Sequence, residues 1–286
     1  MLITEPHAGV APIQRFIDQA HGTLDINTYL ATDDRLLASI AAAVRRGVTV
    51  HILIDRKPYG GRPAGEVARL RATGAQVQFA PARFTGRYRY DHAKYMVDGP
   101  RIEVGSANLT ASAFARNREY LWIGTDASAA RALRTVFQAD WTNRRAGDSL
   151  RRWLVLSPHA TNTLVAVLRQ PGPVCVESEE LGEDRQILAA LRAKGAQIDM
   201  VLPASLSSYD KRVARALGRS GVRIRYLRSP YMHAKLIAGS SEAFIGSQNF
   251  SWTSLNRNRE VGLLLGRSDA YRLRTQCQQD WRHAQP

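Results

Sequence analysis

The sequence has little cysteine and no long hydrophobic run. Only two cysteines occur among 286 residues, Cys175 and Cys277, and they form neither a CxxC pair nor a set of metal ligands. This spacing argues against a disulfide framework and a structural zinc site, so we expect both side chains to lie in the core. No window approaches the length of a membrane span, and the N-terminus lacks the basic and apolar regions of a signal peptide. We therefore expect a soluble chain, either cytoplasmic or the mature form of a secreted protein.

Lysine is also scarce. The chain has five lysines against 35 arginines, and its formal net charge is +15. Such a charge favours an anionic partner, which could be phosphate, nucleic acid or an acidic membrane surface. Two of the few lysines, Lys94 and Lys235, lie in the triplet His-Ala-Lys, which occurs twice. A lysine at both places indicates a need for a compact ammonium group instead of the planar guanidinium fork.

The repetition extends well beyond this triplet. "NREYLWIG" from Asn117 matches "NREVGLLL" from Asn258, and "LRTVFQADW", which ends at Trp141, matches "LRTQCQQDW", which ends at Trp281. A period of about 140 residues is too long for a solenoid repeat and fits a duplicated domain. We predict two similar halves, residues 1–146 and 147–286.

Within each half, helical and strand patterns alternate. The pattern predicts a helix over 35–46, capped by Asp33 or Asp34, and then a β-branched strand over 48–54. A second helix and strand are expected over 64–72 and 75–79. Long helices over 128–141 and 270–281 would cover the sheets. Alternating helices and buried strands predict an α/β fold.

Four further positions repeat at fixed distances from the histidine of each triplet. The offsets from His92 and from His233 are the same, 13, 14, 16 and 27 residues. Identical register in both copies indicates one site design used twice. The positions are Gly105, Ser106, Asn108 and Glu119 in the first half, and Gly246, Ser247, Asn249 and Glu260 in the second.

This pattern resembles the signature of the phospholipase D superfamily, H-x-K-x4-D-x6-G-S-x-N, which is usually present twice. The resemblance covers essentially the whole chain and implies two α-β-α layered halves related by a pseudo-twofold axis. The first copy departs from the signature, because three residues instead of four separate Lys94 from Asp98. The second copy has Gly239 in the place of Asp98. We therefore interpret the acidic residue as structural.

The residue types suit cleavage of a phosphodiester. Alternation along a strand would place His92 and Lys94 on one face, and likewise His233 and Lys235. Gly105 and Gly246 would let a phosphate approach the backbone. The serines, Ser106 and Ser247, would add hydroxyl groups near the phosphate, and the asparagines, Asn108 and Asn249, would add amide donors.

In such a site one neutral imidazole attacks phosphorus, and the other protonates the leaving oxygen and then activates water or an alcohol. The lysines and asparagines neutralise the phosphoryl oxygens, so we expect neither a metal nor another cofactor. Glu119 and Glu260 are expected to accept the Nδ1 proton of the histidine in their own half. By the resemblance, His92 is the nucleophile and His233 the acid and base.

Basic and aromatic residues alternate just before the first triplet. Arg87, Tyr88, Arg89 and Tyr90, together with Trp252 after the second GSxN, are candidates to line a substrate cleft. They could hold a lipid headgroup or stacked bases. We favour a phospholipid substrate with peripheral membrane contact, with a nuclease second and a non-catalytic membrane or nucleic-acid binding module third. Because one chain carries both motifs, we expect a monomer.

Overall fold

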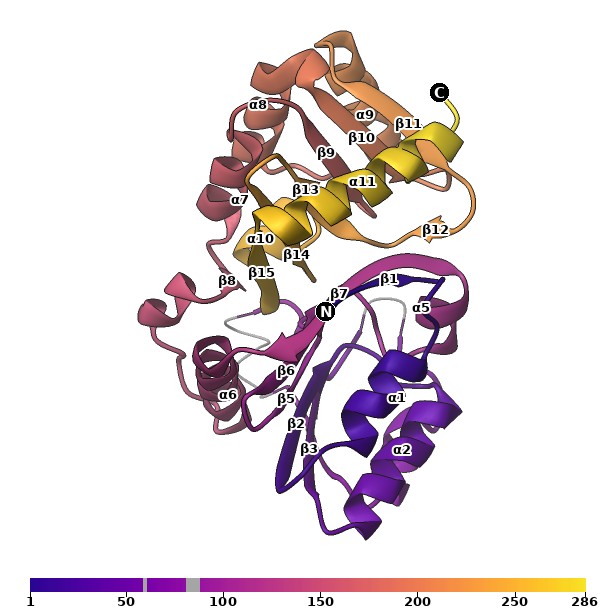
Figure 1. Ribbon diagram of the computed structural model, residues 1–286, viewed down its shortest axis with the longest axis vertical. Helices are drawn as coiled ribbons and strands as arrows, with labels where there is room; N and C mark the ends of the chain where they lie inside the picture. The colour runs from indigo at the N-terminus through magenta and orange to yellow at the C-terminus, as the bar shows by residue number, and fades with distance from the viewer. Residues whose placement is uncertain (59–60, 81–87) are drawn as a thin grey trace.

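The computed structural model describes residues 1–58, 61–80 and 88–286, and it contains two β-sheets, one from each half of the sequence (Figure 1). The strand order of the first sheet is β1-β7-β6-β5-β2-β3-β4, and that of the second is β11-β10-β9-β13-β14-β15-β8. The first comprises β1 (Leu2–Glu5), β2 (Thr23–Thr28), β3 (Thr49–Ile54), β4 (Gln76–Phe79), β5 (Tyr95–Asp98), β6 (Arg101–Gly105) and β7 (Asn117–Thr125). The second comprises β8 (Val155–Ser157), β9 (Val174–Ser178), β10 (Ile198–Pro203), β11 (Arg223–Leu227), β13 (Lys235–Ala238), β14 (Glu242–Gly246) and β15 (Glu260–Gly266).

Helices lie on both faces of each sheet. The outer helices of the first half are α1 (Ala11–Asp18), α2 (Asp34–Arg45), α3 (Glu66–Ala72) and α5 (Ala111–Ala115). Those of the second half are α7 (Thr161–Leu168), α8 (Arg185–Lys194), α9 (Ser208–Arg219) and α10 (Trp252–Asn256). The inner layer contains α6 (Ala127–Trp141) and α11 (Arg267–His283), whose buried residues join both sheets in one hydrophobic core. The predicted α/β class with two similar layered halves is confirmed.

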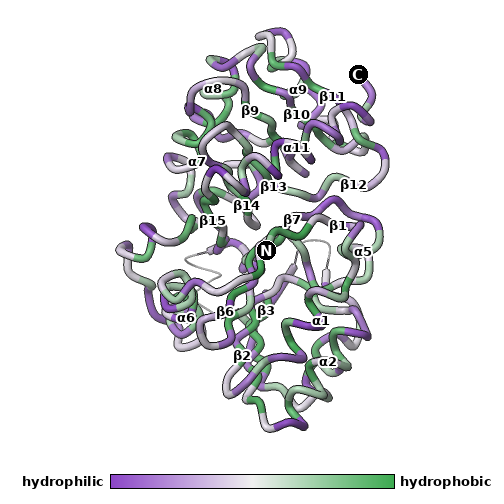
Figure 2. The backbone as a smooth tube through the Cα atoms, in the orientation of Figure 1, coloured by the Kyte–Doolittle hydropathy of each residue, from purple (hydrophilic) through white to green (hydrophobic). Residues whose placement is uncertain are grey.

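Alternation along the strands explains these layers. In β5, Tyr95 and Val97 belong to the inner core, whereas Met96 packs with α1 and α2 in an outer core. Each central strand therefore buries both faces, which is why β3, with Val50, Ile52, Leu53 and Ile54 among its six residues, is largely hydrophobic (Figure 2). A third core lies between the second sheet and α7, α8 and α9.

The first predicted helix and strand form close to the expected positions. Asp33 caps α2 by accepting a hydrogen bond from the Arg35 backbone N–H. Gly47 follows α2 with a φ of +89°, a conformation that favours glycine, and β3 begins at Thr49. The sequence predicted this helix–glycine–strand unit from its cap, its apolar face and its β-branched run.

The expected core position of the two cysteines is confirmed, but the expectation that they form no disulfide is wrong. Cys175 in β9 and Cys277 in α11 form a disulfide and are both buried. The two lie 102 residues apart in sequence, but α11 crosses the second sheet in contact with β9. Sequence spacing does not reveal this packing, because the helix packs on a strand that lies much earlier in the sequence.

Backbone and side-chain contacts interlock the two halves. The short strand β12 (Tyr231–Met232) of the second half pairs with β7 of the first, as Figure 1 shows. A buried ion pair joins Arg118 to Asp280, and its counterpart joins Arg259 to Asp140. Each arginine reaches the aspartate near the C-terminal end of the other half's long inner helix. The repeated N-R-E and Q-x-D-W segments therefore meet across the interface.

Candidate active site

The two histidines of the repeated motif are held by carboxylates from the opposite half. His92 Nδ1 lies 2.9 Å from Glu260 Oε2, and His233 Nδ1 lies 2.8 Å from Glu119 Oε1. Both carboxylates are fully buried. Because an ionised carboxylate can only accept a hydrogen bond, each Nδ1 carries the proton and each Nε2 is left for chemistry.

The expected pairing of each histidine with the glutamate of its own half is therefore wrong. The reason is the strand register between the halves. In the parallel β12–β7 pair, Tyr231 faces Asn117 and Met232 faces Arg118, so the next position brings His233 to Glu119. A parallel bridge between Asp91 and Arg259 brings His92 to Glu260 in the same way.

Each glutamate is fixed by further hydrogen bonds from its own half. Glu119 accepts from Ser106 Oγ at 2.6 Å and from Asn117 Nδ2 at 3.0 Å. Glu260 accepts from Ser254 Oγ at 2.6 Å and from Asn258 Nδ2 at 2.9 Å. The asparagine of N-R-E thus orients the glutamate of the same motif, a role that the repeated sequence could have suggested.

The lysines of the motif are buried beside the histidines. Lys94 is 2% exposed and Lys235 is 0% exposed, and each ammonium group donates to the backbone oxygen of the histidine two residues earlier. The strands predicted over His92–Lys94 and His233–Lys235 start later than expected: β5 begins at Tyr95 and β13 at Lys235. Each histidine lies in the segment that leads into its strand.

The repeated glycines and serines have structural contacts that differ from the predicted phosphate contacts. A Cβ on Gly105 would lie 2.3 Å from the Tyr120 oxygen, and one on Gly246 would lie 2.6 Å from Gly262 Cα. These glycines are needed because neighbouring strands pack closely. Ser106 Oγ donates to Glu119, and Ser247 Oγ contacts the Val261 backbone. Within the described residues, Ser106 therefore holds Glu119 in place and Ser247 holds the backbone of β15 at Val261.

A cleft of about 580 Å³ lies between the halves and is lined by residues of both repeated motifs. Its walls include both histidines and both motif asparagines, His92, His233, Asn108 and Asn249. Arg89 and Tyr90 also line it, as predicted, whereas Arg87 lies outside the described residues. The remaining two candidates do not line it. The Tyr88 ring packs against the Arg259 guanidinium, and Trp252 lines a neighbouring pocket.

Two further residues that line this cleft, Tyr29 and Glu179, were not predicted from the sequence. The Tyr29 ring meets the His92 ring edge-on, with their centroids 4.7 Å apart. Glu179 Oε2 lies 2.8 Å from Lys235 Nζ. Neither repeats as a residue type, so comparison of the halves for identical residues passes over both. Each lies shortly after a buried strand, a position that could have signalled them.

Burial and neighbouring charges shift several pKa values in the site. Burial lowers the pKa of His92, an effect that Glu260 opposes. Burial also lowers the pKa of Lys94, to about 7. Burial alone would raise the pKa of Glu260, but His92 and Lys94 hold it below its usual value. A neutral His92 beside an ionised Glu260 is the state that these shifts favour.

Asp98 lies outside the cleft, at the end of β5. Its carboxylate accepts from Arg101 at 3.0 Å and from the His21 backbone N–H at 3.2 Å. These contacts fit the structural interpretation of this residue. Among residues 1–58, 61–80 and 88–286, no group of three or more His, Cys, Asp or Glu side chains is placed to hold a metal ion.

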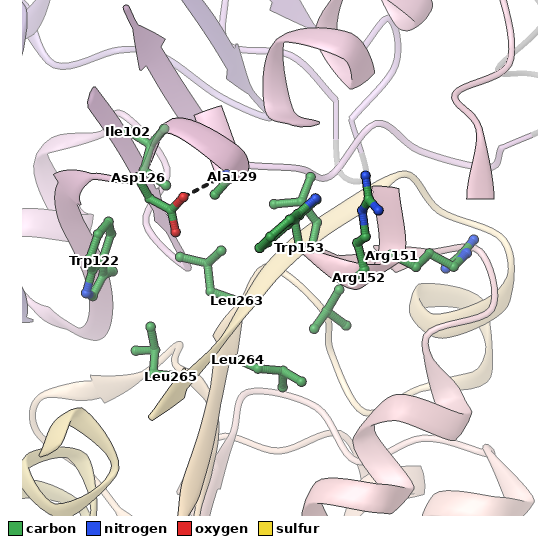
Figure 3. A pocket seen from close by; sticks show the side chains of 12 residues that line it. Ile102, Trp122, Asp126, Ala129, Arg151, Arg152, Trp153, Leu263, Leu264 and Leu265 are labelled. Atoms are coloured by element: carbon green, nitrogen blue, oxygen red, sulfur yellow. Dashed lines mark hydrogen bonds between the residues drawn. The ribbon is translucent and has the colours of Figure 1, made fainter. Parts of the chain in front are cut away.

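A second pocket, of about 200 Å³, lies at the opposite ends of the strands (Figure 3). It is lined by Trp122, Trp153 and Leu263–Leu265, which come from the ends of β7 and β15 remote from Glu119 and Glu260, and from the segment between the halves. It contains none of the repeated histidines, lysines or asparagines, so the cleft is the candidate active site. No helix in the described part of the chain is both long and apolar enough to cross a membrane.

Two layered α/β halves that share one cleft lined by both motif histidines make up the architecture implied by the sequence resemblance. The chain matches the model of the family described as "Cardiolipin synthase, PLD-like domain" over residues 13–141 and 177–281, and it belongs to the phospholipase D superfamily.

Individual proteins are similar to this chain in sequence or in fold. Over 123 residues the chain is 28% identical to a mitochondrial cardiolipin hydrolase of Xenopus laevis, a match covering 43% of this chain and 56% of the relative. The fold is similar to that of phosphatidylserine synthase from Haemophilus influenzae Rd KW20, with a TM-score of 0.76, 12% identity, and coverage of 99% and 86% of the two chains. It is also similar to polyphosphate kinase from Porphyromonas gingivalis, with a TM-score of 0.73, 13% identity, and coverage of 98% of this chain and 50% of the kinase.

Proposed function

We propose that this protein is a phosphodiesterase of the phospholipase D type, which cleaves the headgroup ester of a phospholipid through a phosphohistidine. One observation carries the proposal: both histidines line a single cleft, and each has its Nδ1 held by a buried glutamate of the other half. Two imidazoles with their Nε2 atoms available can act in sequence on one phosphate.

In the first step, the lone pair of His92 Nε2 attacks phosphorus. The bond from phosphorus to the departing alcohol breaks, and His233 Nε2 gives its proton to that oxygen. The lowered pKa of His92 supports its assignment as the nucleophile, because only the neutral ring can attack. Glu260 stabilises the positive charge that the His92 ring gains as the phosphorus–nitrogen bond forms.

In the second step, His233 takes a proton from water or from an alcohol, whose oxygen then attacks phosphorus. The phosphorus–nitrogen bond breaks and His92 returns to its neutral form. Lys94, Lys235, Asn108 and Asn249 would neutralise the phosphoryl oxygens in both steps. With water the result is hydrolysis, and with an alcohol it is transfer of the phosphatidyl group.

Two observations support a lipid over a nucleic acid. The family description and the name of the Xenopus laevis relative both refer to cardiolipin, a phospholipid. The second-half wall of the cleft also carries the ionised carboxylate of Glu179, which would repel the phosphates flanking a scissile bond in DNA or RNA. We expect contact with the membrane surface to be peripheral, and one chain to suffice for activity.

A nuclease is the second candidate, and the net charge of +15 is the observation that favours it. Arg89 and Tyr90, which lie on the first-half wall, could hold a nucleotide. A binding module without catalysis is the third candidate, but it would leave the two glutamate-held histidines without a use.

The test is to incubate the protein, with EDTA present, with vesicles of phosphatidylcholine or cardiolipin and separately with plasmid and single-stranded DNA. The expected result is release of the lipid headgroup while both DNAs stay intact. DNA cleavage with intact lipids would reject the lipid substrate in favour of the nuclease. Loss of all activity in EDTA would reject the metal-free mechanism.

The control variant is His92→Asn, which removes the nucleophile and should abolish turnover. Quenching the wild-type reaction with detergent at alkaline pH, with 32P-labelled substrate, should trap an alkali-stable, acid-labile phosphoenzyme that His92→Asn lacks. Full turnover by this variant would show that the site has been misassigned.

A further inference from the structure

The two halves differ at one position that faces the catalytic pair. Strand register makes the positions equivalent: Asn27 pairs with Tyr95 in the first half, and Glu177 pairs with Leu236 in the second, where Tyr95 and Leu236 directly follow the motif lysines. Two residues beyond Asn27 is Tyr29, and two residues beyond Glu177 is Glu179. A neutral aromatic ring in one half therefore corresponds to a carboxylate in the other.

The contacts of these two residues differ accordingly. Tyr29 offers its ring to the first pair, with Lys94 Nζ 5.3 Å from the ring centroid. Glu179 Oε2 lies 2.8 Å from Lys235 Nζ and 3.4 Å from His233 Nε2. These are the two atoms that would contact a phosphoryl oxygen in the second half. The carboxylate of Glu179 thus lies where a negatively charged oxygen of the substrate would bind.

The charge balance around Glu179 keeps its carboxylate ionised. Burial alone would raise the pKa of Glu179, but His233 and Lys235 lower it well below the usual range. Lys235 is fully buried, and among the described residues Glu179 is its carboxylate partner; its ammonium also donates to the His233 backbone oxygen and lies 3.4 Å from His233 Nδ1. The second half holds an anion of its own, whereas Lys94 in the first half has no such partner among the described residues.

We propose that Glu179 is an internal anion that occupies the phosphate position of the second half, so that a substrate phosphate must displace it. The first half, which has Tyr29 at the equivalent position, is then where the phosphate binds first, next to His92. The inference rests on the proposed function only in taking His233 and Lys235 as phosphate ligands. It makes Glu179 a residue that sets affinity for the anion and distinguishes the two halves.

The test measures binding of inorganic phosphate to the intact protein by isothermal titration calorimetry at pH 7 and fixed ionic strength. Glu179→Gln keeps the shape of the side chain and removes its charge, so it should bind phosphate about tenfold more tightly than wild type. Glu179→Ala removes the charge and the shape, and should also tighten binding. The matched control is Asp210→Asn, because Asp210 lines the same cleft but bonds Ser207 and not Lys235. Its affinity should stay within twofold of wild type.

Three results would overturn the proposal. The first is that neither Glu179 variant binds phosphate more tightly than the wild type, which includes the case in which no protein binds phosphate. Asp210→Asn could give the same gain, which would indicate a general effect of charge. The gain in affinity should vanish in the double variant Glu179→Gln/Lys235→Met, and a gain that persisted there would be the third such result. Thermal melting shows whether each variant is folded. Since phosphate binding requires no turnover, failure to cleave any phosphodiester would reject the proposed function without deciding this result.

Discussion

The buried ion pair between Arg259 and Asp140 gives the sharpest prediction about how the halves are held together. Two hydrogen bonds of 2.8 and 2.9 Å join the guanidinium to the carboxylate, and Arg259 also donates to Tyr88 Oη at 2.8 Å. Both ionic side chains are at most 3% exposed. Removing one partner leaves the other charge buried and unpaired, so Arg259→Met or Asp140→Leu should lower the free energy of unfolding by about 3–5 kcal/mol. The double variant should lose much less than the sum of the single variants.

Urea denaturation followed by circular dichroism measures these changes. With an m-value of about 2–3 kcal/mol per molar urea, each single variant should unfold at a urea concentration lower by about 1–2 M. Asp148→Asn provides a surface control, because Asp148 pairs with Arg151 while 91% of its side chain is exposed, and it should change stability by less than about 1 kcal/mol. Strictly additive losses in the double variant would refute the reasoning, since they would show that the two charges are not coupled.

Three further predictions concern catalysis and the disulfide. Glu260→Gln should lower kcat about 10²- to 10⁴-fold in a steady-state assay, because it weakens the hold on His92 Nδ1, and a normal kcat would contradict the role of this glutamate. Activity should rise with pH as His92 loses its proton, and because burial lowers the pKa of His92 this rise should lie below pH 6.5. Activity should fall above about pH 7, where Lys94 loses its proton. A pH profile of kcat/KM that is flat from 5 to 9 would argue against both assignments. Cys175→Ser should lower the free energy of unfolding by about 2–5 kcal/mol and make it insensitive to reductant, whereas a wild-type protein insensitive to reductant would argue against a stabilising disulfide.

The sequence predicted the parts of the site that depend on local pattern. Identical offsets in both halves identified the histidines and glutamates that meet in the structure. Helix caps and β-branched runs predicted α2 and β3, because these signals act over a few residues. These features need no knowledge of how the halves dock.

Contacts between distant segments could not be assigned in the same way. A duplicated sequence leaves two possible partners for every glutamate, one in each half. The β12–β7 pairing decides the partner of Glu119, and the Asp91–Arg259 bridge decides that of Glu260. The disulfide depends on the path of α11 over β9, which no local pattern specifies. Glu179 was missed because a search for repeated residues discards the positions where the halves differ, and those positions are where two otherwise similar halves can acquire different roles.

The repeated N-R-E segment explains why the site needs both halves. In each copy the asparagine fixes the glutamate two residues later, the arginine binds an aspartate on the other half's inner helix, and the glutamate binds the other half's histidine. Three consecutive residues therefore dock the halves and orient a catalytic ring with the same backbone. Loss of the Arg259–Asp140 pair should consequently disturb the Glu260–His92 contact as well as stability. A half that folded alone would carry a histidine without the carboxylate that sets its tautomer, so the duplicated chain supplies each histidine's orientation as well as the second histidine.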